Sequence, residues 1–281
     1  MPLPRLPKRE PESHKGQYGR ALLVGGSQGM TGAIALAGIA TLRSGAGLVN
    51  LAVPDVCLAT IAAMEPSYTT TPLASDASGR ISDSAGREIL DLASKSTAVA
   101  CGPGLGRSAE LTELMSKLYT QLALPVVFDA DGLNALAECP DVLEKPGGPR
   151  ILTPHVGEFG RLVGRSKVNL QQCNSLAVEM AAHWGVVIVM KSHRTLITDG
   201  KQSLTNTTGN PGMATGGSGD VLTGVITALV CQGLSTFDAA RLGVHVHGLA
   251  GDLAAAQFGE VSMIASDLVS HLPEAFQTVS G

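Results

Sequence analysis

Short apolar runs alternate along most of the chain with segments whose apolar residues recur at helical spacing. The apolar runs predict buried strands at residues 20–25, 48–53, 98–101, 125–128 and 186–190. Helical spacing predicts helices over residues 32–43, 108–119 and 169–184, and the chain after Gly219 is predominantly helical. This alternation predicts an α/β fold with a mostly parallel central sheet and helices on both faces.

Two segments depart from the alternation. Residues 194–198 and 202–206 flank an Asp199-Gly200 turn and therefore predict an antiparallel hairpin. Residues 67–86 are rich in Ser, Thr, Asp and Gly, so we expect an irregular excursion there that carries no chemistry.

Glycine-rich or polar loops follow the predicted strands. Ligands of α/β sheets bind at the carboxyl ends of the strands, where such loops meet. We therefore expect one edge of the sheet to gather the loops at residues 25–32, 102–106, 129–134, 153–158 and 191–195.

The composition limits the domain count and the partners. A chain of 281 residues, 44% hydrophobic and 16% charged, suits one large α/β domain. Four prolines predict an extended arm over residues 1–15, which leaves residues 16–281 as a single domain. A net charge of −4 gives no support to a nucleic-acid partner.

Location follows from two further features of the sequence. No signal peptide precedes the arm and no apolar stretch approaches the length of a membrane span, so we expect a soluble protein without a membrane partner. The five cysteines are scattered and form no CxxC pair, which argues against disulfides and zinc sites and favours a cytoplasmic setting.

The most informative segment is NTTGNPGMATGGSGD, residues 206–220, which opens directly onto an apolar helix. The backbone N–H groups of Gly217, Ser218 and Gly219 at that helix N-terminus can hold a phosphate. A carboxylate beside such an anion site suits removal of a proton from an attacking hydroxyl, which assigns Asp220 the role of general base. The alternative interpretation is that Asp220 caps the helix and the glycines only form a tight turn.

Other polar residues have weaker signals. His155 and Glu158 share one helical turn, where His155 could bind a ligand and Glu158 could hold Mg²⁺ through water, although capping is the common role of such residues. Lys191 ends an apolar strand and offers a cation to phosphates. Asp129 and Asp131 could cap the next helix, and His245 and His247 are interpreted as structural because residues two apart on a helix face different sides.

The GGSQG segment after the first predicted strand is not the GxGxxG fingerprint of redox dinucleotide-binding folds. The glycines still permit close approach of a bulky ligand to the backbone. A dehydrogenase is therefore disfavoured.

Several motifs together resemble one family. They are SHKGQYGR, GGSQGMTGA, SGAGLV, GPGLG, DADGLNAL, TPHVGEFGRL, the KxxxT segment, NxxGMATGGSGDVLTG and the later HGLAGD. The set is similar to the ADP-dependent (S)-NAD(P)H-hydrate dehydratases, which have the ribokinase-like fold, a three-layer αβα arrangement. Two positions differ from the usual family pattern: Val156 replaces a proline and Ser192 replaces a glycine.

The resemblance implies a repair reaction on hydrated NADH or NADPH (NAD(P)HX). An adenine nucleotide, ADP or ATP, phosphorylates the C6 hydroxyl of the S form, and phosphate then leaves to restore NAD(P)H; Mg²⁺ is the implied cofactor. By the same resemblance Asp220 and residues 217–219 are catalytic, and Glu158 is the metal-associated acid. The substrate would contact Ala33, Gly104, His155 and Asp220, and the nucleotide would contact Lys191, Ser192, His193, Arg194, Thr195 and Gly219.

The resemblance also implies an assembly and a functional partner. Family members often form tetramers, so a homotetramer is expected, and the chain looks like a stand-alone dehydratase that works with a separate NAD(P)HX epimerase. Two alternatives remain open: a ribokinase-like kinase that releases a phosphorylated vitamin precursor or sugar, and a non-catalytic nucleotide sensor.

Overall fold

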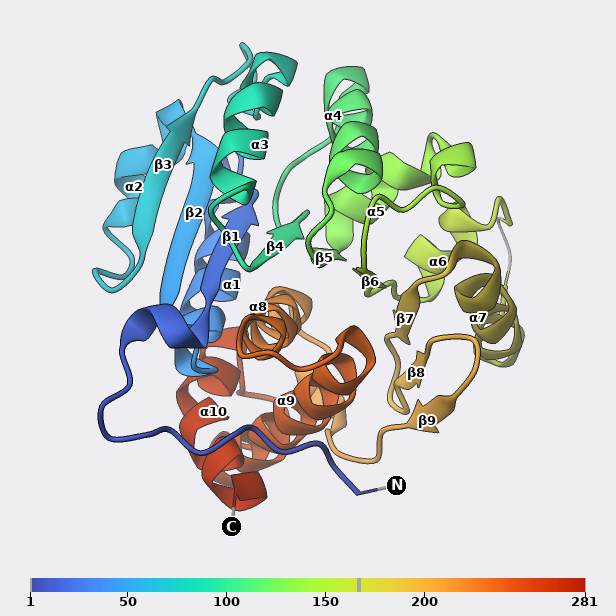
Figure 1. The fold of residues 1–281 in the computed structure, drawn as a ribbon. Helices are drawn as coiled ribbons and strands as arrows, with labels where there is room; N and C mark the ends of the chain where they lie inside the picture. The colour runs from blue at the N-terminus through green and yellow to red at the C-terminus, as the bar shows by residue number, and fades with distance from the viewer. Residues whose placement is uncertain (1, 166–167, 281) are drawn as a thin grey trace.

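One nine-stranded sheet forms the centre of the computed structural model, which describes residues 2–165 and 168–280; the strands run in the order β3-β2-β1-β4-β5-β6-β7-β8-β9 (Figure 1). Strands β1 to β7 pair in parallel, and β8 and β9 continue the sheet as an antiparallel hairpin. Their bounds are β1 Arg20–Val24, β2 Leu48–Pro54, β3 Thr69–Leu73, β4 Ala98–Cys101, β5 Val126–Phe128, β6 Arg150–Leu152, β7 Val187–Met190, β8 Leu196–Thr198 and β9 Ser203–Thr205.

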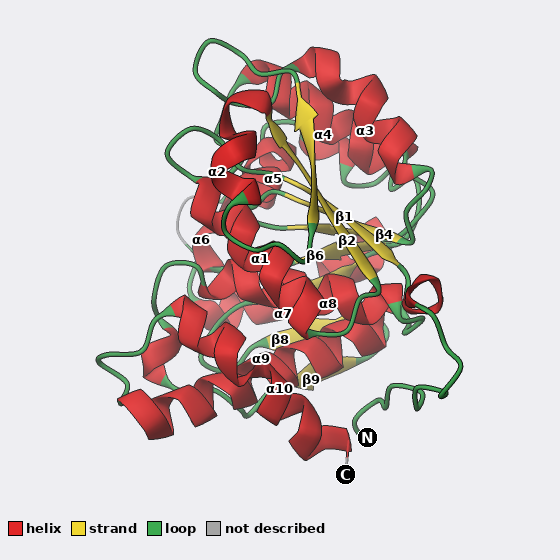
Figure 2. Ribbon diagram, turned by 90° about the vertical axis from the view of Figure 1, so that its left-hand side faces the viewer, coloured by secondary structure: helices red, strands yellow, loops and turns green. Residues whose placement is uncertain are grey.

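Helices cover both faces of the sheet (Figure 2). One face packs against α1 Thr31–Arg43, α2 Leu58–Ala62, α8 Ser218–Cys231, α9 Thr236–Phe258 and α10 Ala265–Ser280. The other face packs against α3 Gly86–Ala93, α4 Ala109–Gln121, α5 Ala130–Ala137, α6 Val156–Leu162 and α7 Leu170–Trp184. Short 3₁₀ turns lie at Lys15–Tyr18, Asp55–Cys57, Asp83–Ala85, Pro140–Val142 and Pro211–Met213.

Strand alternation separates two hydrophobic cores, one on each face of the sheet. In β1, Ala21 and Leu23 point into the core beneath α8, whereas Leu22 and Val24 point into the core beneath α4. Successive side chains of a strand face opposite sides, and both sides of this parallel sheet are covered, so every apolar position of the strand is buried. The expected fold class, a three-layer ribokinase-like α/β arrangement, is confirmed.

The excursion expected at residues 67–86 is partly wrong, because β3 lies within it and pairs in parallel with β2. Its threonines and Pro72 hid the strand from an apolar search. Both are compatible with an edge strand: proline is tolerated there, and the hydroxyl groups of Thr69 and Thr71 bond to Asn50 on β2.

Residues 2–14 contain neither helix nor strand and run across α9 and α10 in Figure 1. Arg9 Nη2 donates to the Gly45 carbonyl at 2.7 Å, and Arg241 Nη2 donates to the Pro2 carbonyl at 2.9 Å. Met1 and Gly281, the outer limits of the expected arm and domain, lie outside the described residues. Within residues 2–165 and 168–280, no helix is both long and apolar enough to cross a membrane.

Candidate active site

The first turn of α8 lies open at the carboxyl edge of the sheet. Gly217 precedes the helix with a left-handed φ of 92°, and a Cβ there would lie 2.7 Å from Leu36 Cδ1 and 2.9 Å from Ala265 Cβ. Glycine is therefore required both by the backbone angle and by the close packing of α1 and α10. No side chain of the described residues caps this helix start, so its first N–H groups and the positive end of its dipole are available to an anion.

Asp220 lies on this first turn and is three-quarters or more hidden from solvent by its neighbours. Burial, together with the nearby carboxylate of Asp129, raises the pKa of Asp220 to about 7; the ammonium group of Lys191 opposes this rise. A carboxyl group with a pKa near neutrality exchanges a proton readily at physiological pH, which is the property that a general base needs.

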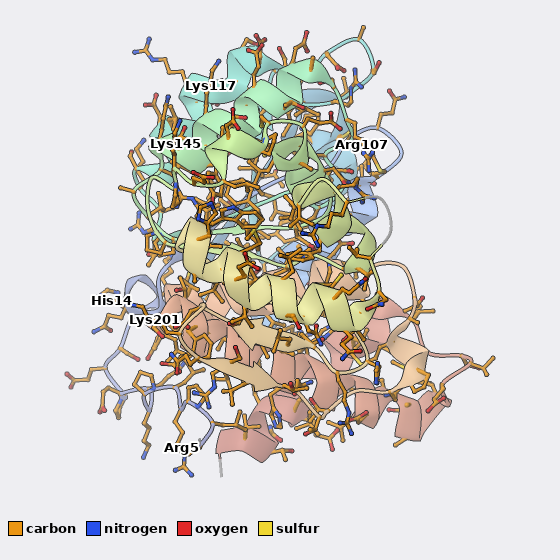
Figure 3. The ribbon with its side chains drawn as sticks, turned by 90° about the vertical axis from the view of Figure 1, so that its right-hand side faces the viewer. Arg5, His14, Arg107, Lys117, Lys145 and Lys201 are labelled. Carbon is orange, nitrogen blue, oxygen red and sulfur yellow. The ribbon has the colours of Figure 1, made fainter. Side chains whose placement is uncertain are left out.

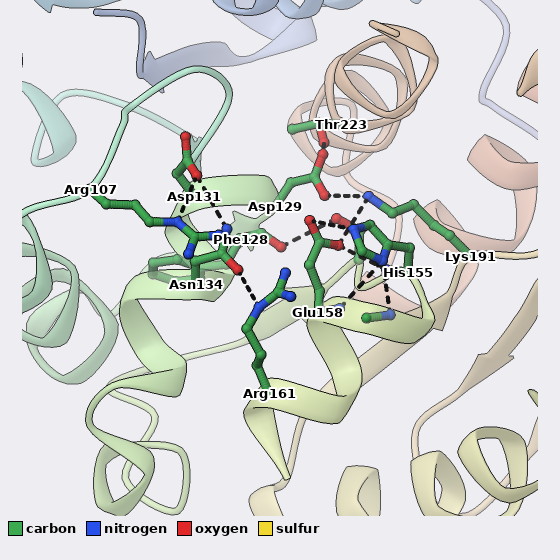
Figure 4. A network of polar contacts seen from close by, with 12 residues as sticks. Arg107, Phe128, Asp129, Asp131, Asn134, His155, Glu158, Arg161, Lys191 and Thr223 are labelled. Carbon is green, nitrogen blue, oxygen red and sulfur yellow. Dashed lines mark hydrogen bonds and ion pairs between the residues drawn. The ribbon is translucent and has the colours of Figure 1, made fainter. Parts of the chain in front are cut away.

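An ion network lies beside Asp220 (Figure 4). Lys191 Nζ is 2.6 Å from Asp129 Oδ1 and 3.7 Å from Glu158 Oε2, and Thr223 Oγ1 on α8 donates to Asp129 Oδ2 at 2.8 Å. Burial alone would lower the pKa of Lys191, but the charges of Asp129 and Glu158 outweigh it and raise this pKa. Lys191 therefore keeps its positive charge inside the site.

Asp129 precedes α5, yet its side chain does not cap that helix. The carboxylate points to Lys191 and Thr223 instead, and the residue is only 1% exposed. The capping interpretation of Asp129 is therefore wrong. Asp131, the second acid of this motif, accepts the Gly106 N–H at 2.9 Å and so ties α5 to the loop after β4.

His155 and Glu158 form a reciprocal capping box at the start of α6. His155 Nδ1 accepts from the N–H of Gly157 and of Glu158, and Glu158 Oε2 accepts the His155 N–H at 2.8 Å. The common structural role thus applies to both residues. The side chain of His155 is nevertheless 54% exposed, which leaves its other edge accessible to a ligand.

The segment from Lys191 to Thr195 divides into two parts. Lys191 turns inward to Asp129, and its Nζ would lie 3.3 Å from a Cβ on Gly219, so the cation faces the glycine loop of α8. Thr195 is buried and closes a tight turn, because its Oγ1 donates to the Ser192 carbonyl at 2.9 Å. His193 and Arg194 are exposed.

Ala33 and Gly104, expected to contact the substrate, lie side by side although 71 positions separate them. A Cβ on Gly104 would be 3.2 Å from Ala33 Cβ and 2.5 Å from the Met30 carbonyl oxygen. Ser27 Oγ donates to the Gly104 carbonyl at 2.8 Å and holds the two loops together. These loops follow β1 and β4, as expected from the sheet topology.

His247 contacts the α8 loop, a link that sequence reasoning missed. It lies on α9, and its Nε2 is 2.9 Å from the Ser218 carbonyl oxygen. Burial, assisted by the Lys191 cation, lowers the pKa of His247 to about 4, so the imidazole is neutral near pH 7 and its Nε2–H donates to Ser218. The structural interpretation of His247 holds, but the part that it supports is the anion-binding turn. The HGLAGD motif was the only signal for it.

Metal binding has limited support in the site. Across residues 2–165 and 168–280, no three His, Cys, Asp or Glu side chains are arranged to hold a metal ion. The ammonium group of Lys191 lies between Asp129 and Glu158, the two carboxylates nearest to it. The donor set therefore fits a magnesium ion that arrives with a nucleotide and takes most of its ligands from phosphate and water.

The layered sheet and the glycine loop at the start of α8 define a protein of the ribokinase-like class. A ribokinase-like superfamily protein from Enterococcus faecalis superposes with a TM-score of 0.83 and 25% identity, covering 98% of this chain and 92% of that one. The chain belongs to the NAD(P)H-hydrate dehydratase family, whose model matches residues 21–274.

Two further relatives agree with this assignment. The bifunctional NAD(P)H-hydrate repair enzyme of Moorella thermoacetica is 45% identical over 272 residues, which are 96% of this chain and 51% of that protein. The ADP/ATP-dependent NAD(P)H-hydrate dehydratase of Bacillus subtilis, crystallised with ATP and Mg²⁺, has a TM-score of 0.82 and 30% identity, covering 98% of this chain and 94% of that one. The chain spans about half the length of the curated relatives that it matches.

Proposed function

We propose that the chain restores NADH and NADPH from the S form of their hydrates at the expense of an adenine nucleotide. The observation that carries the proposal is the pairing of Asp220 with the uncapped first turn of α8. One supplies a base for a hydroxyl, and the other supplies N–H donors for a transferring phosphoryl group.

The reaction follows from these two parts. Asp220 takes the proton of the C6 hydroxyl while that oxygen forms a bond to the terminal phosphorus of the nucleotide, and the shortened nucleotide departs with the electrons of the broken P–O bond. The N–H groups of residues 217–219 and the cation of Lys191 balance the charge that develops on the phosphoryl oxygens. The ring nitrogen lone pair then expels phosphate from C6, and loss of the C5 proton restores the dihydropyridine.

The remaining assignments are part of the same proposal. Ala33, Gly104 and His155 contact the hydrated nucleotide, and residues 191–195 with Gly219 contact ADP, the expected donor. Mg²⁺ accompanies the nucleotide, with Glu158 as its nearest acid. We expect a cytoplasmic homotetramer that works with an NAD(P)HX epimerase; the names of the curated relatives describe bifunctional enzymes.

The direct test mixes the purified chain with the S hydrate, Mg²⁺ and either ADP or ATP. Recovery of the dihydronicotinamide absorbance with an equal amount of released phosphate supports the proposal and identifies the donor. A stable phosphorylated product without recovery would support the kinase alternative, and nucleotide binding without turnover would support the sensor alternative.

The pH dependence of kcat/KM tests the role of Asp220. A general base must be ionised, and the pKa of Asp220 is about 7. We therefore expect kcat/KM to fall about tenfold per pH unit below pH 7 and to level off above it. Nucleotide affinity measured over the same range is the control, and a profile without a bend between pH 6 and 8 would contradict this assignment.

Substitution of His247 tests whether the α8 turn must be held in place. His247→Leu removes the donor to Ser218, so we expect kcat to fall about 10- to 100-fold with little change in KM. His247→Gln can place an amide N–H near the position of Nε2 and should recover most of the activity, while His245→Gln on the same helix is the matched control. Equal losses in His247→Leu and His247→Gln would indicate a packing role only.

A further inference from the structure

A cavity of about 560 Å³ lies between the first turns of α4 and α5, outside the residues assigned above. Its volume is in the range of small-molecule sites. It is lined by Gly106, Arg107, Ser108, Ala109, Leu111, Thr112, Glu113, Asp131, Asn134, Ala135 and Glu138. Nothing in the proposed reaction uses these side chains.

The cavity adjoins the reaction centre on the side away from Lys191. Its walls follow β4 and β5, whereas Lys191 follows β7, and Asp129 at the end of β5 lies between them. Figure 4 shows Arg107 and Asp131 on one side of Asp129 and Lys191 on the other. The charge of Asp131 also raises the pKa of Asp220, which places the cavity wall within electrostatic reach of the base.

The polar wall of the cavity is held in place by a chain of hydrogen bonds. Asp131 accepts from Gly106 N–H at 2.9 Å and from Asn134 Nδ2 at 3.2 Å, and Asn134 Oδ1 accepts from Arg161 Nε at 2.8 Å. Arg80 of the 74–81 turn is bonded both to Asp76 and to the Arg107 carbonyl. Because these groups are already fixed, a ligand would not have to order them.

We propose that this cavity binds the adenosine half of the hydrated dinucleotide; the inference rests on the proposed function. The substrate has two nucleoside halves, and only the nicotinamide half reacts at Asp220. With the nucleotide donor on the Lys191 side, the cavity on the opposite side of Asp129 is the site left for the second half. Leu111, Ala109 and Ala135 offer apolar surface to a purine, and Asp131 offers carboxylate oxygens to ribose hydroxyls.

The charges of the lining favour NADHX over NADPHX. Three acids, Glu113, Asp131 and Glu138, face one cation, Arg107, which makes a net charge of −2 (one positive minus three negative). Arg107 is 3.7 Å from Asp131, so part of its charge is already balanced. A phosphate on the 2′ oxygen would meet this negative field, whereas a free 2′ hydroxyl would not.

The first experiment fills the cavity. Ala109 is exposed in the first turn of α4, so Ala109→Trp should fold normally and occupy the purine surface. We expect it to raise KM for NADHX about tenfold or more while KM for the nucleotide and kcat at saturation stay unchanged. Hydrated reduced nicotinamide mononucleotide lacks the adenosine half, so its kinetic constants should be equal in wild type and variant.

The second experiment changes the charge. The Glu113→Gln/Glu138→Gln variant should narrow the preference for NADHX over NADPHX by about two- to fivefold, and Arg107→Ala should widen it by a similar factor. Lys117→Ala is the matched control, because Figure 3 shows Lys117 on the same face of the molecule but far from Arg107, and Lys117 does not line the cavity.

The outcomes separate this inference from the proposed function. If the wild type dehydrates neither the dinucleotide nor the mononucleotide, the proposed function fails. If the wild type is active but Ala109→Trp leaves KM for NADHX unchanged, or raises KM equally for the mononucleotide, the cavity does not bind adenosine. A wild-type preference for NADPHX would overturn the charge argument.

Discussion

Asp220→Asn is expected to lower kcat about 10²- to 10⁴-fold while leaving nucleotide affinity nearly unchanged. Asparagine keeps the shape of the side chain and the first turn of α8, but its amide cannot take the proton of the attacking hydroxyl. Single-turnover assays of NADH recovery measure the loss, and equilibrium binding of ADP and of ATP provides the control. Activity within tenfold of the wild type would show that another group acts as the base.

The same substitution should increase stability at neutral and alkaline pH. The pKa of Asp220 is about 7 in the folded chain and near 3.8 when unfolded. Both states are protonated below pH 3.8; between pH 3.8 and 7 only the unfolded state releases the proton, so the stability of the wild type falls as pH rises and the loss is complete above pH 7. Asparagine has no such dependence.

Urea unfolding at pH 5 and pH 8 tests this linkage. We expect the midpoint difference between Asp220→Asn and wild type to be larger at pH 8 than at pH 5. An equal difference at both pH values would mean that the raised pKa is not a property of the folded chain. A gain in stability with a loss of catalysis is the signature of a carboxylate retained for chemistry.

The sequence was sufficient to predict the layers of the fold and the loop that holds the anion site. Continuous apolar strands such as Val187–Met190 can only be satisfied inside a covered parallel sheet, and Ser108 caps α4 as its position suggests. The edge strand β3 escaped prediction because a strand with one free edge does not need apolar residues on every position.

Charged residues inside the fold were harder to predict, because their partners are distant in sequence. Arg150 on β6 is 1% exposed, and its guanidinium donates to the carbonyl groups of Tyr119 and Leu124 near the end of α4. Asp129 pairs with Lys191 across 62 positions. Local patterns identify a cap or a strand end at such residues, whereas only the assembled sheet edge shows which opposite charge or carbonyl lies beside them.

Lys191→Met should be the most destabilising of the substitutions considered. It leaves Asp129, which is 1% exposed, with a buried negative charge and only Thr223 as its donor. Breaking a buried ion pair from one side costs about 3–5 kcal/mol. Urea unfolding measures this cost, and Lys201→Met, an exposed lysine in the turn after β8 labelled in Figure 3, is the matched control.

Activity should fall for a separate reason, and a double variant can isolate it. Asp129→Asn/Lys191→Met removes both charges, so stability should recover toward that of the wild type. Activity should stay low, because no cation then faces Gly219 where the phosphoryl group is transferred. In Lys191→Met alone the bend of the pH profile should move to higher pH, since Lys191 lowers the pKa of Asp220. If the double variant regained both stability and activity, Lys191 would serve only to neutralise Asp129, and the α8 turn would have to balance the transferring phosphoryl group without it.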